Sequence, residues 1–115
     1  MVTNYRLHNN FARHVLSVVK SIPHGRVSTY ADVATMAGNP SAWRAVGNII
    51  RLSGNDSVPC HRVVNSNGQV GGYNVPAMKV ELLRLEGIRF RGKKILRFEE
   101  LRWQKLIPGI HRQDK

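Results

Sequence analysis

Residues 29–52, TYADVATMAGNPSAWRAVGNIIRL, contain the clearest structural pattern in the sequence. A Gly-Asn-Pro turn divides the stretch, and the capping residues and apolar spacing on either side predict two short helices over Tyr30–Ala37 and about Pro40–Leu52. Val46 and Ile50 are four positions apart in the second helix, so both can face the interior. Two short helices joined by such a turn are a helix-turn-helix candidate.

The ends of these two helices carry residues that are typical of helix caps. Thr29 with Asp32 three positions later is close to the pattern of a capping box at the start of the first helix. Gly38 follows that helix at the position where a left-handed conformation is common. Asn39 can cap the second helix, with Pro40 at its first position.

The second helix is expected to expose cations beside small side chains. Arg44 and Asn48 share one face and Arg51 lies at its end, while the small residues leave the surface flat enough for a nucleic-acid backbone to approach. The candidate DNA-binding residues are Arg44, Ala42, Ala45, Gly47, Asn48 and Arg51. This assignment agrees with the docking of helix-turn-helix proteins through their second helix.

Composition supports a basic, globular domain. The chain has 115 residues, of which 42% are hydrophobic and 22% charged, so we expect one folded domain. Lys and Arg number 18 against 7 Asp and Glu, and the net charge of +11 favours a polyanionic partner, nucleic acid before a membrane surface. No apolar run is long enough for a membrane span, and the polar residues Met1–Asn10 do not resemble a signal peptide. We therefore expect a cytoplasmic (nucleoid) or nuclear protein without a membrane partner.

The remaining elements are expected to be short. The patterns predict a helix over Asn10–Ser21, a strand at Val63–Val64 that turns at Asn65–Gly68, a helix from about Pro76 to Gly87, a hairpin of Ile88–Phe90 with Ile95–Phe98, and Leu101 and Trp103 covering the core. The expected organisation is an N-terminal arm over residues 1–9, a domain over 10–104 and a disordered tail over 105–115. The fold class is mainly α with short β-strands.

Cys60 is the one cysteine of the chain, so it can form neither an intramolecular disulfide nor a multi-thiolate metal site. It follows Pro59 and precedes His61 and Arg62, whose nitrogens are expected to favour the thiolate, the nucleophilic form. A histidine oriented by a carboxylate is the usual device for activating a thiol, and Glu86 is the candidate carboxylate. The alternative is a small buried side chain without chemistry.

A thiolate beside a basic helix-turn-helix suggests chemistry on a nucleic-acid base, which must leave the stack to enter a pocket. Such a reaction needs a side chain to fill the vacancy and a pocket wall for stacking. Arg44 can fill the vacancy, and Tyr30 and Tyr73 can line the pocket. The alternatives are that Tyr30 only packs its helix and that Arg44 only contacts phosphate.

The segment Val58–Val64, VPCHRVV, resembles the active-site signature of the 6-O-alkylguanine-DNA alkyltransferases, the methylated-DNA–protein-cysteine methyltransferases. Four further segments resemble this family in the same order: Gly25–Tyr30, Ala37–Pro40, Arg44–Gly47 and Leu82–Gly87. The resemblance covers about residues 10–90 and adds a winged helix-turn-helix arrangement to the expected fold.

The resemblance implies a role for each matching residue. Cys60 would accept the alkyl group, His61 would take the thiol proton through a water, and Glu86 would hold the imidazole. Tyr30 would help to protonate the leaving guanine, and Arg44 would fill the gap in the duplex. The pocket would be lined by Tyr30, Ile50, Pro59, Val63 through its carbonyl, Tyr73 and Asn74. The resemblance requires no cofactor and no metal, and it implies a monomer acting on double-stranded DNA with alkylated guanine.

Some features depart from the family pattern. About ten residues precede the first helix where full-length members carry a domain, and the usual hinge asparagine is replaced by Ser53 or displaced to Asn55. Trp43 stands where a small residue is usual. The short chain and its Leu101–Trp103 ending resemble the alkyltransferase-like proteins, which flip the lesion without transfer, recruit nucleotide-excision repair proteins and normally have tryptophan in place of Cys60. The hypotheses are therefore an alkyl-transferring enzyme first, a lesion sensor second and a plain helix-turn-helix regulator third.

Overall fold

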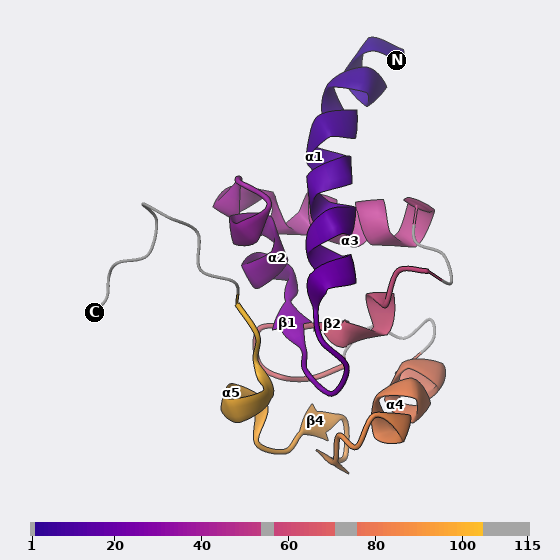
Figure 1. Ribbon diagram of the computed structural model, residues 1–115, viewed down its shortest axis with the longest axis vertical. Coiled ribbons are helices and arrows are strands. Elements are labelled where there is room, and N and C mark those ends of the chain that lie inside the picture. The colour runs from indigo at the N-terminus through magenta and orange to yellow at the C-terminus, as the bar shows by residue number, and fades with distance from the viewer. Residues whose placement is uncertain (1, 54–56, 71–75, 105–115) are drawn as a thin grey trace, which may run out of the picture.

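The computed structural model describes residues 2–53, 57–70 and 76–104, and side chains within residues 10–52, 57–70 and 78–104 (Figure 1). The described elements are α1 (Val2–Ser21), β1 (Ser28–Thr29), α2 (Tyr30–Met36), a 3-10 turn (Pro40–Ala42), α3 (Trp43–Ser53), a 3-10 turn (Cys60–Arg62), β2 (Val63–Val64), α4 (Pro76–Leu85), β3 (Phe90–Arg91), β4 (Lys94–Ile95) and α5 (Phe98–Leu101). The protein is mainly helical with short strands, arranged as a winged helix-turn-helix, which confirms the predicted fold class.

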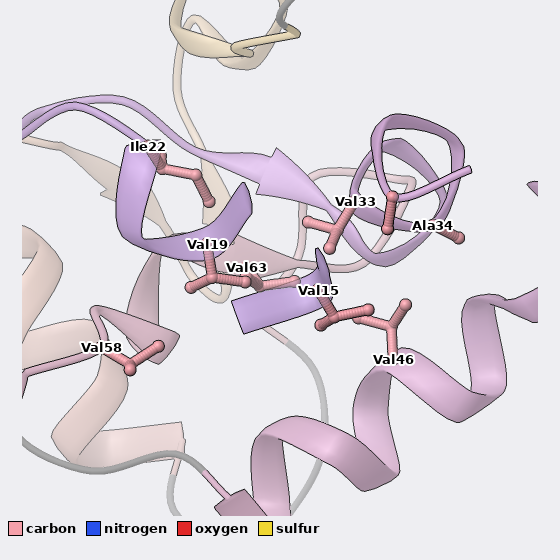
Figure 2. Packing of buried hydrophobic residues seen from close by; sticks show 9 residues of the cluster. Val15, Val19, Ile22, Val33, Ala34, Val46, Val58 and Val63 are labelled. Atoms are coloured by element: carbon pink, nitrogen blue, oxygen red, sulfur yellow. The ribbon is translucent and has the colours of Figure 1, made fainter. Parts of the chain in front are cut away.

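The helical half of the molecule is built around α1, α2 and α3. Val15, Val19 and Ile22 recur every three or four residues and place one side of α1 in the core (Figure 2). Burying an aliphatic side chain of this size contributes roughly 1.5–3 kcal/mol. The residues that meet there from the other segments are Val33, Ala34, Ala37, Val46, Val58 and Val63.

Helix α1 begins at Val2, whereas the sequence pattern predicted a start at Asn10. The apolar stripe marks only the part of the helix that packs, and it begins at Phe11. Residues 2–9 contain neither Pro nor Gly, so nothing in the local sequence ends the helix before it leaves the core. Figure 1 shows this first part of α1 projecting beyond α2 and α3.

The caps of α2 confirm the prediction. The Asp32 N–H donates to Thr29 Oγ1 over 2.9 Å and the Thr29 N–H donates to Asp32 Oδ2 over 3.0 Å, which completes the capping box. Gly38 follows with a φ of +103°, a left-handed conformation that a side chain would strain.

The turn into α3 differs from the prediction. The Asn39 side chain makes no capping bond to the helix, and its Oδ1 instead accepts a hydrogen bond from Ser41 Oγ over 3.1 Å. The segment expected as one helix is a 3-10 turn over Pro40–Ala42 followed by α3. The chain is wound more tightly at this point, as is common at the start of an α-helix.

Strands β1 and β2 pair in parallel, with Ser28 opposite Val63. This pairing joins the start of α2 to the segment that follows Cys60. The end of the described chain lies along the other side of β1, where Val27 bridges Arg102 and the Trp103 N–H donates to the Val27 carbonyl over 2.6 Å. Trp103 packs against the helical core and Leu101 against the second core, as the sequence predicted.

The second core lies under the hairpin and α4. Its buried members are Val27, Val64, Val70, Leu83, Ile88, Ile95 and Phe98. The hairpin strands β3 and β4 are shorter than expected, because the chain leaves β4 after Ile95 and Arg97 takes a left-handed conformation with a φ of 58° just before α5. Across the described residues, none of the helices has the length and apolar character needed to cross a membrane.

Candidate functional site

Cys60 lies in a turn between the helical core and α4. It opens the 3-10 turn before β2, and the parallel pairing of β2 with β1 brings it close to Tyr30, the first residue of α2. Both side chains are partly buried and pack against the helical core. Cys60 is therefore shielded from bulk water on one side, yet its side chain is not closed into the core.

His61 and Glu86 lie in direct contact, as the sequence predicted for the candidate carboxylate. His61 Nε2 is 2.7 Å from Glu86 Oε2. Glu86 also accepts a hydrogen bond of 2.8 Å from the Gly25 N–H and bonds of 2.8 and 3.0 Å from Arg62 Nη2 and Nε. Arg62 Nη1 donates to the Ile22 carbonyl over 2.8 Å, so this network ties the 3-10 turn to the end of α1.

These donors keep Glu86 ionised. Burial raises the pKa of its carboxyl group, but hydrogen bonds from Arg62, the Gly25 N–H and His61, with the charge of Arg62, lower the pKa to about 2. An ionised carboxylate can only accept hydrogen bonds, so His61 carries its proton on Nε2. Its Nδ1 is then the ring nitrogen that can take up a proton.

The expectation that His61 and Arg62 would favour the Cys60 thiolate is wrong, because the pKa of the thiol is raised and not lowered. Both side chains are directed to the carboxylate of Glu86, which offsets the charge of Arg62. Burial raises the pKa of the Cys60 thiol, and the nearby charge of Lys79 and a backbone hydrogen bond only partly offset that rise. Burial, and to a lesser extent Cys60, also raises the pKa of Tyr30.

Lys79, a residue of α4, is the cation that the sequence analysis missed. Its Nζ is 3.4 Å from Tyr30 Oη and 5.6 Å from the centre of the Tyr30 ring. Burial lowers the pKa of Lys79 to about 8, an effect that Cys60 opposes. One signal could have found it, because Lys79 lies four residues, about one helical turn, before the buried Leu83 and so lies on the same side of α4.

The exposed face of α3 carries the predicted cations. Arg44, Asn48 and Arg51 are all exposed, and Arg51 Nη2 donates to Asn48 Oδ1 over 3.0 Å. Ala42 and Ala45 are partly buried beside them. Gly47 faces Tyr30, because a Cβ atom added to it would lie 3.8 Å from Tyr30 Cε1.

The other predicted pocket residues are only partly placed. Ile50 and Pro59 are partly buried, and the Val63 side chain is fully buried. The structure does not describe Tyr73, Asn74 or Asn55, and it describes the backbone of Ser53 but not its side chain. Among the residues that the structure describes, no group of three or more His, Cys, Asp or Glu side chains could hold a metal ion.

The family model for the DNA-binding domain of 6-O-methylguanine DNA methyltransferase matches residues 10–88. The chain belongs to this family. Its relatives include the DNA base-flipping protein of Escherichia coli, which is 37% identical over 98 residues covering 83% of this chain and 75% of the relative. The methylated-DNA–protein-cysteine methyltransferase of Homo sapiens is 46% identical over 85 residues, which cover 70% of this chain and 40% of the relative.

A solved structure of S. pombe Atl1, in complex with damaged DNA containing O6-carboxymethylguanine, has the same fold. It superposes with a TM-score of 0.73 at 31% identity, covering 84% of this chain and 97% of Atl1. The similar proteins therefore carry the names of methyltransferases and of base-flipping or Atl proteins.

Lys79→Met is expected to make Cys60 harder to ionise. Removing the cation leaves burial as the main influence on the thiol, so the pKa of Cys60 should rise further above its ordinary value. The rate of alkylation of Cys60 by iodoacetamide, measured from pH 6 to 10, gives the midpoint directly. Lys93→Met, at an exposed lysine of the hairpin turn, is the matched control. An unchanged midpoint in Lys79→Met would show that Lys79 does not act on the thiol.

Proposed function

We propose that this protein repairs 6-O-alkylguanine in duplex DNA by transferring the alkyl group irreversibly to Cys60. The observation that carries the proposal is the adjacency of a partly buried cysteine to a histidine that is held by an ionised carboxylate, His61 with Glu86 at 2.7 Å. This arrangement supplies a nucleophile, a neighbouring proton acceptor and a third group that orients the acceptor, as activation of a thiol requires.

DNA binding is assigned to the exposed face of α3. Its cations would neutralise phosphates, and the net charge of +11 would add long-range attraction to the duplex. The alkylated guanine would leave the stack and enter the space beside Tyr30 and Cys60, and Arg44 would fill the vacancy.

The transfer is a single displacement. The Cys60 proton passes to His61 Nδ1 through a water molecule, and the thiolate sulfur attacks the alkyl carbon. A new S–C bond forms as the C–O6 bond breaks, and the electron pair leaves with guanine. Tyr30 donates a proton to the leaving base, and Lys79, with its Nζ 3.4 Å from Tyr30 Oη, stabilises the resulting phenolate. The thioether product is stable, so each molecule acts once.

Intact-protein mass spectrometry tests the proposal. The protein is incubated with a duplex that carries one 6-O-methylguanine, and an otherwise identical undamaged duplex serves as the control. A mass gain of one methylene group with the damaged duplex alone, located on Cys60 by peptide sequencing, is expected. Unchanged mass after binding to the lesion would overturn the transfer.

The second candidate function is a lesion sensor that binds and flips alkylguanine without transfer and hands it to excision repair. The likeness to S. pombe Atl1, of which 97% is covered, favours it. Lesion-selective binding with unchanged mass is the result that this function predicts. The third candidate function, a sequence-specific regulator, predicts equal affinity for damaged and undamaged duplexes.

Arg44→Ala is expected to reduce base extrusion more than it reduces binding. Loss of one phosphate contact weakens binding to damaged and undamaged duplexes alike, whereas loss of the side chain that fills the vacancy acts only on the flipped state. Fluorescence of a purine analogue beside the lesion reports extrusion, and anisotropy reports affinity. Arg91→Ala, at an exposed arginine of β3, is the control for charge. Equal losses in both measurements would restrict Arg44 to phosphate contact.

A further inference from the structure

Trp43 is a large aromatic side chain on the exposed surface of α3. It is the first residue of that helix, and 47% of its surface is exposed, whereas the other tryptophan, Trp103, packs against the helical core. The Arg44 guanidinium carbon lies 5.0 Å from the centre of the Trp43 ring, in the geometry of a cation–π contact. The residue proposed to enter the duplex is thus held against an exposed indole.

The position of Trp43 on the helix relates it to the pocket. Trp43, Gly47 and Ile50 are spaced four and three residues apart, so they lie on one side of α3. On that side Gly47 faces the Tyr30 ring, and Ile50 packs against the same core cluster as Tyr30 and Cys60. Trp43 lies one helical turn before Gly47 on this side, and it is followed directly in sequence by the exposed Arg44.

We propose that Trp43 is a nucleotide-stacking residue of this DNA-binding surface, an inference that rests on the proposed function. In the free protein its ring holds Arg44. In the complex Arg44 enters the duplex, and the uncovered ring face stacks on a nucleotide next to the flipped guanine. An exposed cation–π contact is weak in water, whereas stacking of a base on an aromatic ring is stronger, so the exchange favours the complex.

The fluorescence of Trp43 tests this directly. Trp103→Phe keeps an aromatic ring in the core and leaves Trp43 as the one tryptophan of the chain, because the sequence has two. Titration with duplex DNA should quench its emission in parallel with the rise in anisotropy of the labelled duplex. Binding by anisotropy without a change in Trp43 emission would overturn the stacking and leave the proposed function intact. Absence of DNA binding in both measurements would overturn the stacking role of Trp43 and the proposed function together.

Affinity measurements supply a second, independent readout. Trp43→Ala should weaken binding about five- to 100-fold, and Trp43→Phe should recover much of the loss, because stacking needs an aromatic face and not a charge. The slope of log affinity against log salt should stay that of the wild type, whereas loss of a phosphate contact lowers it by about one. Leu85→Ala, at a side chain of α4 that is 73% exposed, is the control for removing a surface apolar group. Wild-type affinity in Trp43→Ala, or a lowered salt slope, would contradict the proposal.

Discussion

Cys60→Ser is expected to abolish alkyl transfer while leaving binding to 6-O-methylguanine duplexes within a few-fold of the wild type. A serine hydroxyl ionises far less readily than a thiol and is a weak nucleophile without strong activation. The substitution changes one atom in a partly buried side chain and leaves the contact of His61 with Glu86 in place. Intact mass after incubation with the damaged duplex measures transfer, and anisotropy of the labelled duplex measures binding.

A chemical control tests the role of the Cys60 sulfur without a substitution. Because the sequence has one cysteine, iodoacetamide treatment of the wild type blocks Cys60 without any mutation. The blocked protein should gain no methylene group, in agreement with the serine variant. Transfer that persists in Cys60→Ser would remove Cys60 as the acceptor. Loss of both transfer and binding in that variant, with the fold retained by circular dichroism, would instead assign Cys60 to the shape of the pocket.

The helix-turn-helix could be predicted because its signals are local. The Thr29–Asp32 capping box and Gly38 each act within one helical turn, and the structure confirms both. The start of α1 could not be located in the same way. An apolar stripe reports packing and not helix length, so the polar turns beginning at Val2 carried no signal.

The identities of the residues around Cys60 were predicted better than their electrostatics. His61 and Arg62 are neighbours of Cys60 in sequence, which suggested that they favour the thiolate. Glu86, which is 24 residues from Arg62, offsets the charge of Arg62 and holds His61, and local sequence does not reveal the strength of such long-range contacts. The influence of Lys79 on Cys60 could not be predicted for the same reason. It depends on the packing of α4 against the Cys60 turn, which the whole fold determines.

Glu86→Gln is expected to destabilise the fold by about 3 kcal/mol at pH 7, because the carboxylate pKa is about 2 in the folded protein against an ordinary value of 4.5. The variant keeps the shape of the side chain but leaves the charge of Arg62 without its partner in a largely buried site. Urea unfolding at pH 7 measures the loss. Glu81→Gln, at an exposed glutamate of α4, is the matched control and should stay close to the wild type.

The pH dependence distinguishes this ion pair from a packing effect. A carboxyl group whose pKa is lowered on folding stabilises the protein fully above its unfolded pKa, and the contribution is lost as pH falls through the folded value. The difference between wild type and Glu86→Gln should therefore shrink from about pH 5 downward, be mostly lost at pH 2, where Glu86 is half protonated in the folded protein, and approach zero below that pH. A difference that stays constant over this range would mean that the glutamine disturbs packing. Transfer by the variant is measured separately, at a temperature where it remains folded. Slower transfer there would assign Glu86 a positioning role toward His61, because the glutamine amide can donate its N–H to Nε2 and so favour the other tautomer of the imidazole.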